Sequence, residues 1–260
     1  MKKNKNFIYR ELPIHSDFEG IIEKVWEFSV KEDMPERPFK LMSDFLPSII
    51  IRSNNNEVSL FLKGAFTKKT LFPSEGGTLI RCIRLYSPLI YPLFGIKCSG
   101  LKNSFLPVSE LCDNVIDPVE YFLPVKSNFD DQIRNFGNAI LKKEIEPADK
   151  VIYKAVREFL DSKGNIDYSE YIKNTGIGER QFQRRFKNET GLTAREFLKT
   201  MKIINLASEM VKNDFADKGL IFDFGYFDQP HFNKAFKDIF GDAPLRFLER
   251  QKSVQYERQF

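Results

Sequence analysis

The sequence repeats one segment at a fixed offset of fifty residues near its C-terminal end. QFQRRFKNETGLTAREFL, residues 181–198, returns as HFNKAFKDIFGDAPLRFL, residues 231–248. The agreeing pairs are Phe182 and Phe232, Phe186 and Phe236, Lys187 and Lys237, Gly191 and Gly241, Phe197 and Phe247, and Leu198 and Leu248. Aromatic anchors and a turn glycine are what a packed helix and its C-terminal end require. The repeat therefore indicates a packing scaffold that the chain builds twice.

Each copy predicts a helix with a polar face opposite its phenylalanines. Phe182 and Phe186 are four residues apart and share the buried face, as Phe232 and Phe236 do in the second copy. The polar residues left on or beside the opposite face are Arg180, Gln183, Arg184 and Lys187 in the first copy and Gln229, Asn233, Lys234 and Lys237 in the second. Arg and Gln can pair with base edges, and Arg or Lys can hold phosphates. A short helix, a tight turn and such a second helix are typical of a helix-turn-helix unit.

The alternative interpretation of these faces is that they are simply solvated, as on any amphipathic helix. Two copies at one offset argue against it. The helix predicted over 194–213 adds a geometric argument, since it would be roughly 30 Å long at ~1.5 Å per residue. Successive major-groove faces on one side of B-DNA are ~34 Å apart. One chain could thus place both helices in adjacent grooves.

Residues 150–250 resemble the DNA-binding domain of the AraC/XylS family of bacterial transcription regulators. The family's second unit carries GF, then F, FK, G and P at fixed spacings, which here reads GYFDQPHFNKAFKDIFGDAP over 225–244. The first unit's counterpart reads FQRRFKNETG over 182–191. The resemblance implies two helix-turn-helix units joined by a long helix. It departs from the family at Ile172 and Ile221, where relatives usually keep a small residue, and at Asp217 and Gly219.

By the same resemblance, the base-reading residues are Arg180, Gln183 and Arg184 in the first unit and Gln229, Asn233 and Lys234 in the second. Phosphate contacts are expected from Arg185, Lys187 and Lys237. Pro230, which lacks a backbone N–H, is expected to start the second recognition helix.

The front half predicts a β-rich domain with added helices. Runs of β-branched and aromatic residues between 45 and 86 are separated by Asn, Gly and Pro, which is typical of antiparallel strands. Residues 21–30 are expected to be a helix or a strand, and helices are expected over 108–116, with Ser109 as N-cap, and over 127–145, with Ser127 or Asn128 as N-cap. The boundary is expected near 145–150. The fold class is thus α+β, with a β-rich domain over 1–147 and an all-α double helix-turn-helix domain over 148–260.

The strings FLPSIII, KGAF and RCIRLYSPLIYPLFG also resemble the cupin-like N-terminal sensor domain of some AraC-type regulators. The resemblance implies that this domain binds a small effector, forms a homodimer, or does both. The expected function is a sequence-specific DNA-binding transcription regulator with double-stranded DNA as partner. The alternative left open is a small-molecule-binding module tethered to a degenerate DNA-binding domain.

Composition excludes other classes more than it selects one. The formal net charge is only +4, so attraction to DNA must come from local clusters. Three cysteines, an odd number at no short spacing, fit a reducing cytosol better than a disulfide scaffold. The N-terminal lysines precede no apolar run, and no apolar stretch approaches the ~20 residues of a membrane span. We expect a cytoplasmic protein without membrane contact.

An enzymatic role is not expected. The only histidines are His15 and His231, too few for a catalytic zinc or iron site, so no metal and no cofactor are predicted. Glu75, Gly76 and Gly77 form a turn without phosphate-loop spacing. Phe61, Phe66, Tyr86 and Tyr91 could line a metal-free pocket, although aromatic residues at strand spacing are more often core.

Overall fold

The computed structural model describes residues 6–35, 39–41, 44–54, 57–68, 70–72, 75–123, 128–212, 220–224, 226, 228–251 and 254–258. Its strands are β1 (Phe7–Leu12), β2 (Ile22–Val30), β3 (Phe39–Leu41), β4 (Ser48–Asn54), β5 (Glu57–Lys63), β6 (Thr70–Phe72), β7 (Leu79–Leu85), β8 (Phe105–Pro107) and β9 (Val254–Arg258). A seven-stranded sheet has the order β8-β5-β4-β7-β2-β1-β9, and β3 pairs with β6 separately. All pairings are antiparallel except that of β1 with β9. The β-rich first domain is confirmed.

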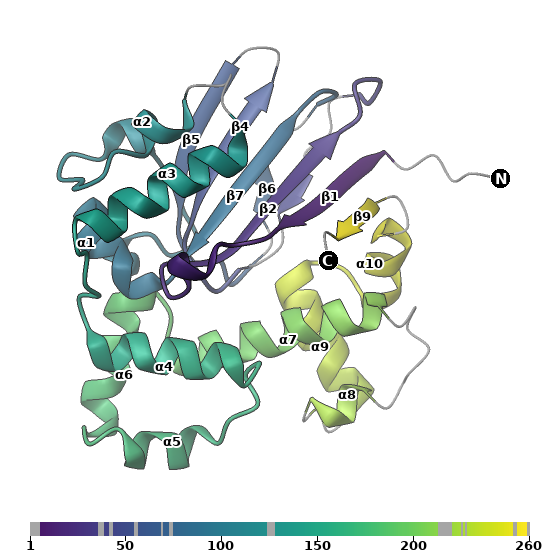
Figure 1. Cartoon of the computed structure of the whole chain (residues 1–260). Helices are drawn as coiled ribbons and strands as arrows, with labels where there is room; N and C mark the ends of the chain where they lie inside the picture. Colours follow the sequence, from purple (N-terminus) through teal and green to yellow (C-terminus); the bar gives the residue numbers. More distant parts are fainter. Residues whose placement is uncertain are drawn as a thin grey trace.

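Both faces of the large sheet are apolar. In β4, Ile49 and Ile51 pack on one face, and Ile50 between them packs on the other, as the two-residue period of a strand requires. Helices α1 (Ile90–Phe94), α2 (Pro118–Phe122) and α3 (Phe129–Lys142) cover the face of Ile49 (Figure 1). Burial of the side chains on both faces explains why the central strands are nearly continuous runs of hydrophobic residues.

Two local predictions in this domain have different outcomes. Residues 21–30, expected as a helix or a strand, form β2, because pairing with β1 and β7 satisfies their backbone on both sides. The prediction of a helix over 108–116 is wrong. Only a 3-10 turn at Val108–Glu110 forms there, and it ends where Leu111 becomes extended. In contrast, α3 forms as expected, and Asn128 caps it by accepting a hydrogen bond from the Asp130 amide at 3.1 Å.

The C-terminal half is helical, as predicted, except for the strand β9, which the all-α prediction for 148–260 did not include. Its helices among the described residues are α4 (Lys150–Asp161), α5 (Tyr168–Asn174), α6 (Glu179–Thr190), α7 (Ala194–Lys212), α8 (Leu220–Asp223), α9 (Gln229–Phe240) and α10 (Pro244–Gln251). Figure 1 shows α7 lying beneath the sheet domain, with α6 at one end and α9 and α10 at the other. The domain boundary expected after Pro147 falls between α3 and α4 and stays a prediction.

The core of the first helical unit includes residues of the sheet domain. Phe45 and Leu46, which precede β4, and Ala65, which follows β5, are buried among the side chains of α4, α6 and α7. The rings of Phe45 and Phe197 meet edge to face, with centroids 5.1 Å apart. The two domains therefore share one hydrophobic core at this point.

A buried ionic cluster holds this segment from behind. The Asp44 carboxylate accepts hydrogen bonds from Lys63 Nζ at 3.2 Å and from the Leu46 amide at 3.3 Å, and it forms an ion pair with Arg84 Nη2 at 3.2 Å. Lys63 Nζ also donates to the carbonyls of Leu46 and Gly64. Burial opposes the charged form of Asp44, but Arg84 and Lys63 outweigh it and hold the pKa of that carboxyl below its ordinary value. The cluster fixes the backbone that carries Phe45 and Leu46.

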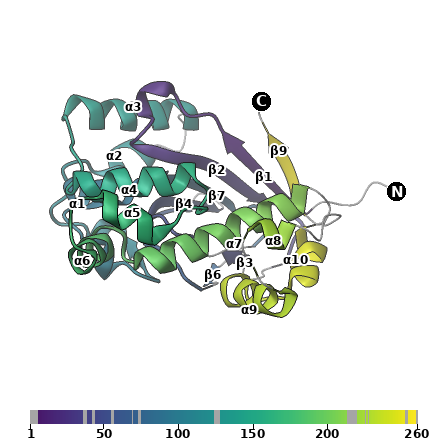
Figure 2. The ribbon, with the colours of Figure 1, turned by 90° about the horizontal axis from the view of Figure 1, so that it is seen from below.

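The C-terminal strand returns to the first domain. β9 pairs in parallel with β1, with Phe7 opposite Val254 and Glu11 opposite Arg258. Figures 1 and 2 both show it alongside β1, so β9 covers this edge of β1.

No described helix is both long and apolar enough to cross a membrane.

We predict that Phe45→Ala lowers the free energy of unfolding by about 3 kcal/mol, because it opens a cavity in the core that the two domains share. Urea denaturation followed by circular dichroism measures the change. Phe222→Ala is the control, since Phe222 is 59% exposed. Equal effects of the two substitutions would contradict the shared core.

Candidate nucleic-acid interface

The first helix-turn-helix unit consists of α5, a short turn and α6. Gly176 in the turn has φ +72°, a conformation that favours glycine. Phe182 and Phe186 of α6 are fully buried, and their rings contact Tyr171, Phe159 and Phe197. The phenylalanines thus anchor α6 against α4, α5 and α7.

The second unit, built from α8 and α9, repeats this arrangement. Phe232 and Phe236 are buried, and Phe236 contacts Phe247 of α10. The Asp228 carboxylate caps α9 by accepting from the His231 amide at 2.7 Å, and Pro230 lies in the first turn as expected. A separate core joins this unit to the second half of α7.

Both copies end in the same way. Gly191 follows α6 and Gly241 follows α9, each in the left-handed conformation, with φ of +77° and +72°. Their amides donate to the carbonyls of Lys187 and Lys237, at equivalent positions of the repeat. The repeated glycine is thus a helix terminator.

A single helix connects the two units. Leu198 and Met201 in the first half of α7 pack into the core of the first unit, while Ile203, Leu206 and Met210 pack into that of the second. The 19 residues of α7 span about 28 Å at 1.5 Å per residue. Thr193 and Glu196 form a reciprocal capping box at its start, with distances of 2.9 and 3.2 Å. In Figure 2, α6 and α9 lie near opposite ends of α7.

The expected reading residues lie mostly on exposed surface. In the first unit Arg180, Gln183, Arg184 and Lys187 are exposed; in the second, Gln229, Lys234 and Lys237 are exposed and Asn233 is half-buried. The Gln183 amide group donates to the Glu179 carboxylate at 2.9 Å, one turn earlier on the helix. Glu179 was not among the expected residues, although its spacing from Gln183 allows this contact.

Arg185 lies elsewhere. Its guanidinium faces α4 and makes two hydrogen bonds of 2.6 Å to the Asp149 carboxylate. Burial opposes ionisation of Asp149, but the bonds from Arg185 and from two backbone amides outweigh it and lower the pKa of that carboxyl. The phosphate contact expected of Arg185 therefore competes with an internal ion pair.

The substituted leading helices are well packed. Ile172 of α5 and Ile221 of α8 are both buried in the cores of their units. Each isoleucine thus fills space in its core that a smaller residue would leave for neighbouring side chains to fill. Asp217 and Gly219 lie outside the described residues.

The sheet domain presses directly on the first unit. A Cβ on Gly191 would lie 2.6 Å from the Cys98 carbonyl oxygen, so glycine is required there by space as well as by φ. Lys102 Nζ binds the Glu196 carboxylate at 2.8 Å, and the Tyr153 hydroxyl donates to the Gly20 carbonyl at 2.8 Å. No sequence signal identified these partners, because each joins residues far apart in the chain.

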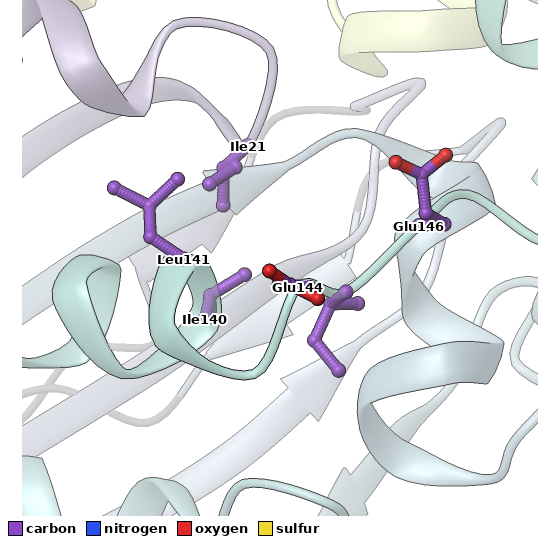
Figure 3. Close-up of a pocket in the computed structure, with 6 residues that line it drawn as sticks. Ile21, Ile140, Leu141, Glu144 and Glu146 are labelled. Carbon is purple, nitrogen blue, oxygen red and sulfur yellow. The ribbon is translucent and has the colours of Figure 1, made fainter.

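An open depression lies beside the interdomain connection in the described part of the first domain. Its volume is about 460 Å³, and its lining residues are Ile21, Ile140, Leu141, Glu144, Ile145 and Glu146 (Figure 3). Glu146 is already paired with Lys150 at 2.7 Å. The aromatic residues that could have lined a metal-free pocket lie apart: Phe61 and Phe66 pack on Phe105, Tyr86 packs on Tyr153, and Tyr91 is exposed.

The described residues contain no group of three or more His, Cys, Asp or Glu side chains able to hold a metal ion. The His231 ring is exposed and packs against Tyr226, with centroids 5.3 Å apart. Cys82 and Cys98 are buried free thiols, and burial raises the pKa of Cys82 to about 12, which makes it unreactive near neutral pH.

Comparisons with known proteins bear on the C-terminal part most directly. Residues 171–250 match the family model of a helix-turn-helix domain. The chain is also similar to ToxT from Vibrio cholerae O395 bound to (E)-4-(8-methylnaphthalen-1-yl)but-3-enoic acid, at 14% identity and a TM-score of 0.46 over 94% of this chain and 99% of that one. Unsaturated-fatty-acid-bound ToxT from strain SCE256 is similar at 15% identity and a TM-score of 0.43, over 99% and 100%. No curated protein matches the sequence.

We predict that Asp149 stabilises the fold above its unfolded pKa of ~3.9 and that this contribution is lost as pH falls through its lower folded pKa. The gap in unfolding free energy between the unsubstituted protein and Asp149→Asn should therefore be constant near neutral pH and narrow below about pH 4. Urea titrations at several pH values measure it. Arg185→Met should give the same narrowing, and a gap that is as large at pH 2.5 as at neutral pH would contradict the ionic origin.

Proposed function

We propose that this protein, whose residues 171–250 match the model of a helix-turn-helix domain, is a sequence-specific transcription regulator of the AraC type that places α6 and α9 in successive major grooves. The observation that carries the proposal is the structural repeat. Two helices with equivalent buried phenylalanines and an equivalent terminating glycine pack on the two halves of one helix of about 28 Å. The groove spacing of ~34 Å on one side of B-DNA is close to this length. One chain would then bind a bipartite site, in the cytoplasm.

The base contacts are assigned to the exposed polar residues of the two helices. Arg180 and Arg184 suit guanine, and Gln183 suits adenine once it leaves Glu179. In the second unit Gln229, Asn233 and Lys234 take the equivalent positions. Lys187 and Lys237, at the same place in each copy, are assigned to phosphates.

The sheet domain is assigned the regulatory role. Phe45 and Leu46 reach into the core of the first unit, so a change at this end of the sheet would alter how α6 is held. A small effector or a second copy of the chain would act by favouring one arrangement of the two domains over another. Buried Ile221 removes one motive for the alternative of a degenerate DNA-binding domain.

We predict that Arg184→Ala weakens binding to the preferred duplex by ~1–3 kcal/mol and relaxes the preference at one base pair. Selection from a random duplex library supplies that duplex, and mobility shifts measure the affinity. Asn188→Ala is the matched control on the exposed surface of α6. Equal loss on specific and random duplexes would assign Arg184 to phosphate instead.

We predict that Lys234→Ala changes the preference only in the half of the site bound by α9, leaving the half bound by α6 unaltered, because the two units have separate cores. Repeating the library selection with the variant measures both halves at once. Recovery of a site with a single conserved half from the unsubstituted protein would show that α9 reads no bases.

A further inference from the structure

We infer that Asp149 and Arg185 form a joint that sets the orientation of α6, and that Arg185 is a positioning residue and not a phosphate ligand. The inference rests on the proposed function, which it deepens by naming how the first reading helix is held.

The contact between the two side chains is a two-pronged ion pair. Arg185 Nε donates to Asp149 Oδ2 and Arg185 Nη2 donates to Oδ1, both at 2.6 Å. The side chains are 28% and 11% exposed, so water screens the pair only partly. A planar guanidinium that meets a carboxylate in this way fixes direction as well as distance, which a lysine could not do.

Asp149 is itself held in place because its carboxylate also binds backbone amides of α4. Its Oδ1 accepts from the amides of Val151 at 3.0 Å and Ile152 at 3.1 Å, which makes it the N-cap of α4. If the carboxylate rotated toward solvent, the first turn of α4 would lose its cap. Arg185 is thus tied to the start of α4 through a carboxylate of fixed orientation.

The start of α4 is fixed in turn to the sheet domain. The Ala148 amide donates to the Pro88 carbonyl at 2.9 Å. One turn into α4, Tyr153 packs on Tyr86 and its hydroxyl donates to the Gly20 carbonyl. Gly20 has φ +92°, and a Cβ there would lie 2.4 Å from the Tyr153 hydroxyl oxygen. The connection thus runs from the sheet, through Asp149, to the middle of α6.

No side chain caps the N-terminal end of α6, where Gly178 precedes the helix. Phe182 and Phe186 hold its inner side, and Gly191 rests against Cys98 at its far end. The Arg185 fork is a restraint on its flank, next to the proposed base-reading Arg184. A helix that tilts without it would move Arg184 relative to the groove, and hydrogen bonds to base edges tolerate little misplacement.

The charge balance agrees with this assignment. A guanidinium neutralised by a carboxylate 2.6 Å away attracts phosphates far less than a free one. Arg185 should therefore add little to the dependence of DNA binding on salt, which counts the phosphates that a protein neutralises.

The first experiment compares Arg185→Lys, Asp149→Asn and their double variant on the duplex recovered by selection, over a range of salt concentrations. Lysine keeps the charge for a phosphate but cannot form the fork, and asparagine keeps the cap. We expect each single variant to bind roughly tenfold more weakly, with an unchanged salt slope, and the double variant to be no weaker than either. Lys187→Met, on the same helix, should instead reduce the slope by about 0.9.

The second experiment measures orientation without DNA. Spin labels on exposed Cys112 and on a cysteine introduced by Asn188→Cys report the distance between the sheet domain and α6, since Cys82 and Cys98 are buried. Arg185→Lys and Asp149→Asn should broaden the distance distribution.

An unchanged distribution in both variants overturns the inference, as does Arg185→Lys with unsubstituted affinity. If the unsubstituted protein binds no duplex selectively while the variants still broaden the distribution, the proposed function fails and the joint stands.

Discussion

The insertion of Phe45 and Leu46 into the core of the first helical unit is the contact on which the arrangement of the two domains depends. Both residues lie in the segment that precedes β4, and the buried pairing of Asp44 with Lys63 and Arg84 fixes that segment. A buried ion pair adds little net stability compared with apolar residues of the same size, but removal of one partner is costly. Its role here is to position the chain, because Asp44 and Lys63 also bind the backbone amide and carbonyl of Leu46, next to Phe45.

The two reading units are consequently held in different ways. The first touches the sheet domain through Phe45, Gly191, Tyr153 and Glu196. The second has a core of its own, and the described residues tie it to the rest through α7 and through the pairing of β9 with β1. A change in the sheet domain would therefore reach α6 through packed side chains, whereas it would reach α9 along a helix and a strand edge.

The sequence predicted well whatever depends on local spacing. Phenylalanines four residues apart, followed by a glycine, determine a helix, its buried face and its end, and each of these features is present twice. Residues 108–116 are an exception, because packing of Val108 and Leu111 on the sheet overrides their helical pattern. The contacts between domains were beyond reach, since Cys98 with Gly191 or Lys102 with Glu196 leave no periodic trace in the sequence.

Arg184 and Arg185 illustrate the same limit within a single helix. The sequence presents two adjacent arginines between two phenylalanines, and both residue types suit DNA equally well. Successive residues on a helix point about 100° apart, so if one faces away from the core the other must lie along a flank. The neighbour that the flanking residue contacts depends on the fold, and for Arg185 this neighbour is the Asp149 carboxylate, which caps α4. The partner of Arg185 therefore depends on where α4 begins, which the sequence near Arg185 does not reveal. For that reason residue chemistry alone assigned Arg185 to phosphate, whereas the structure pairs it with Asp149.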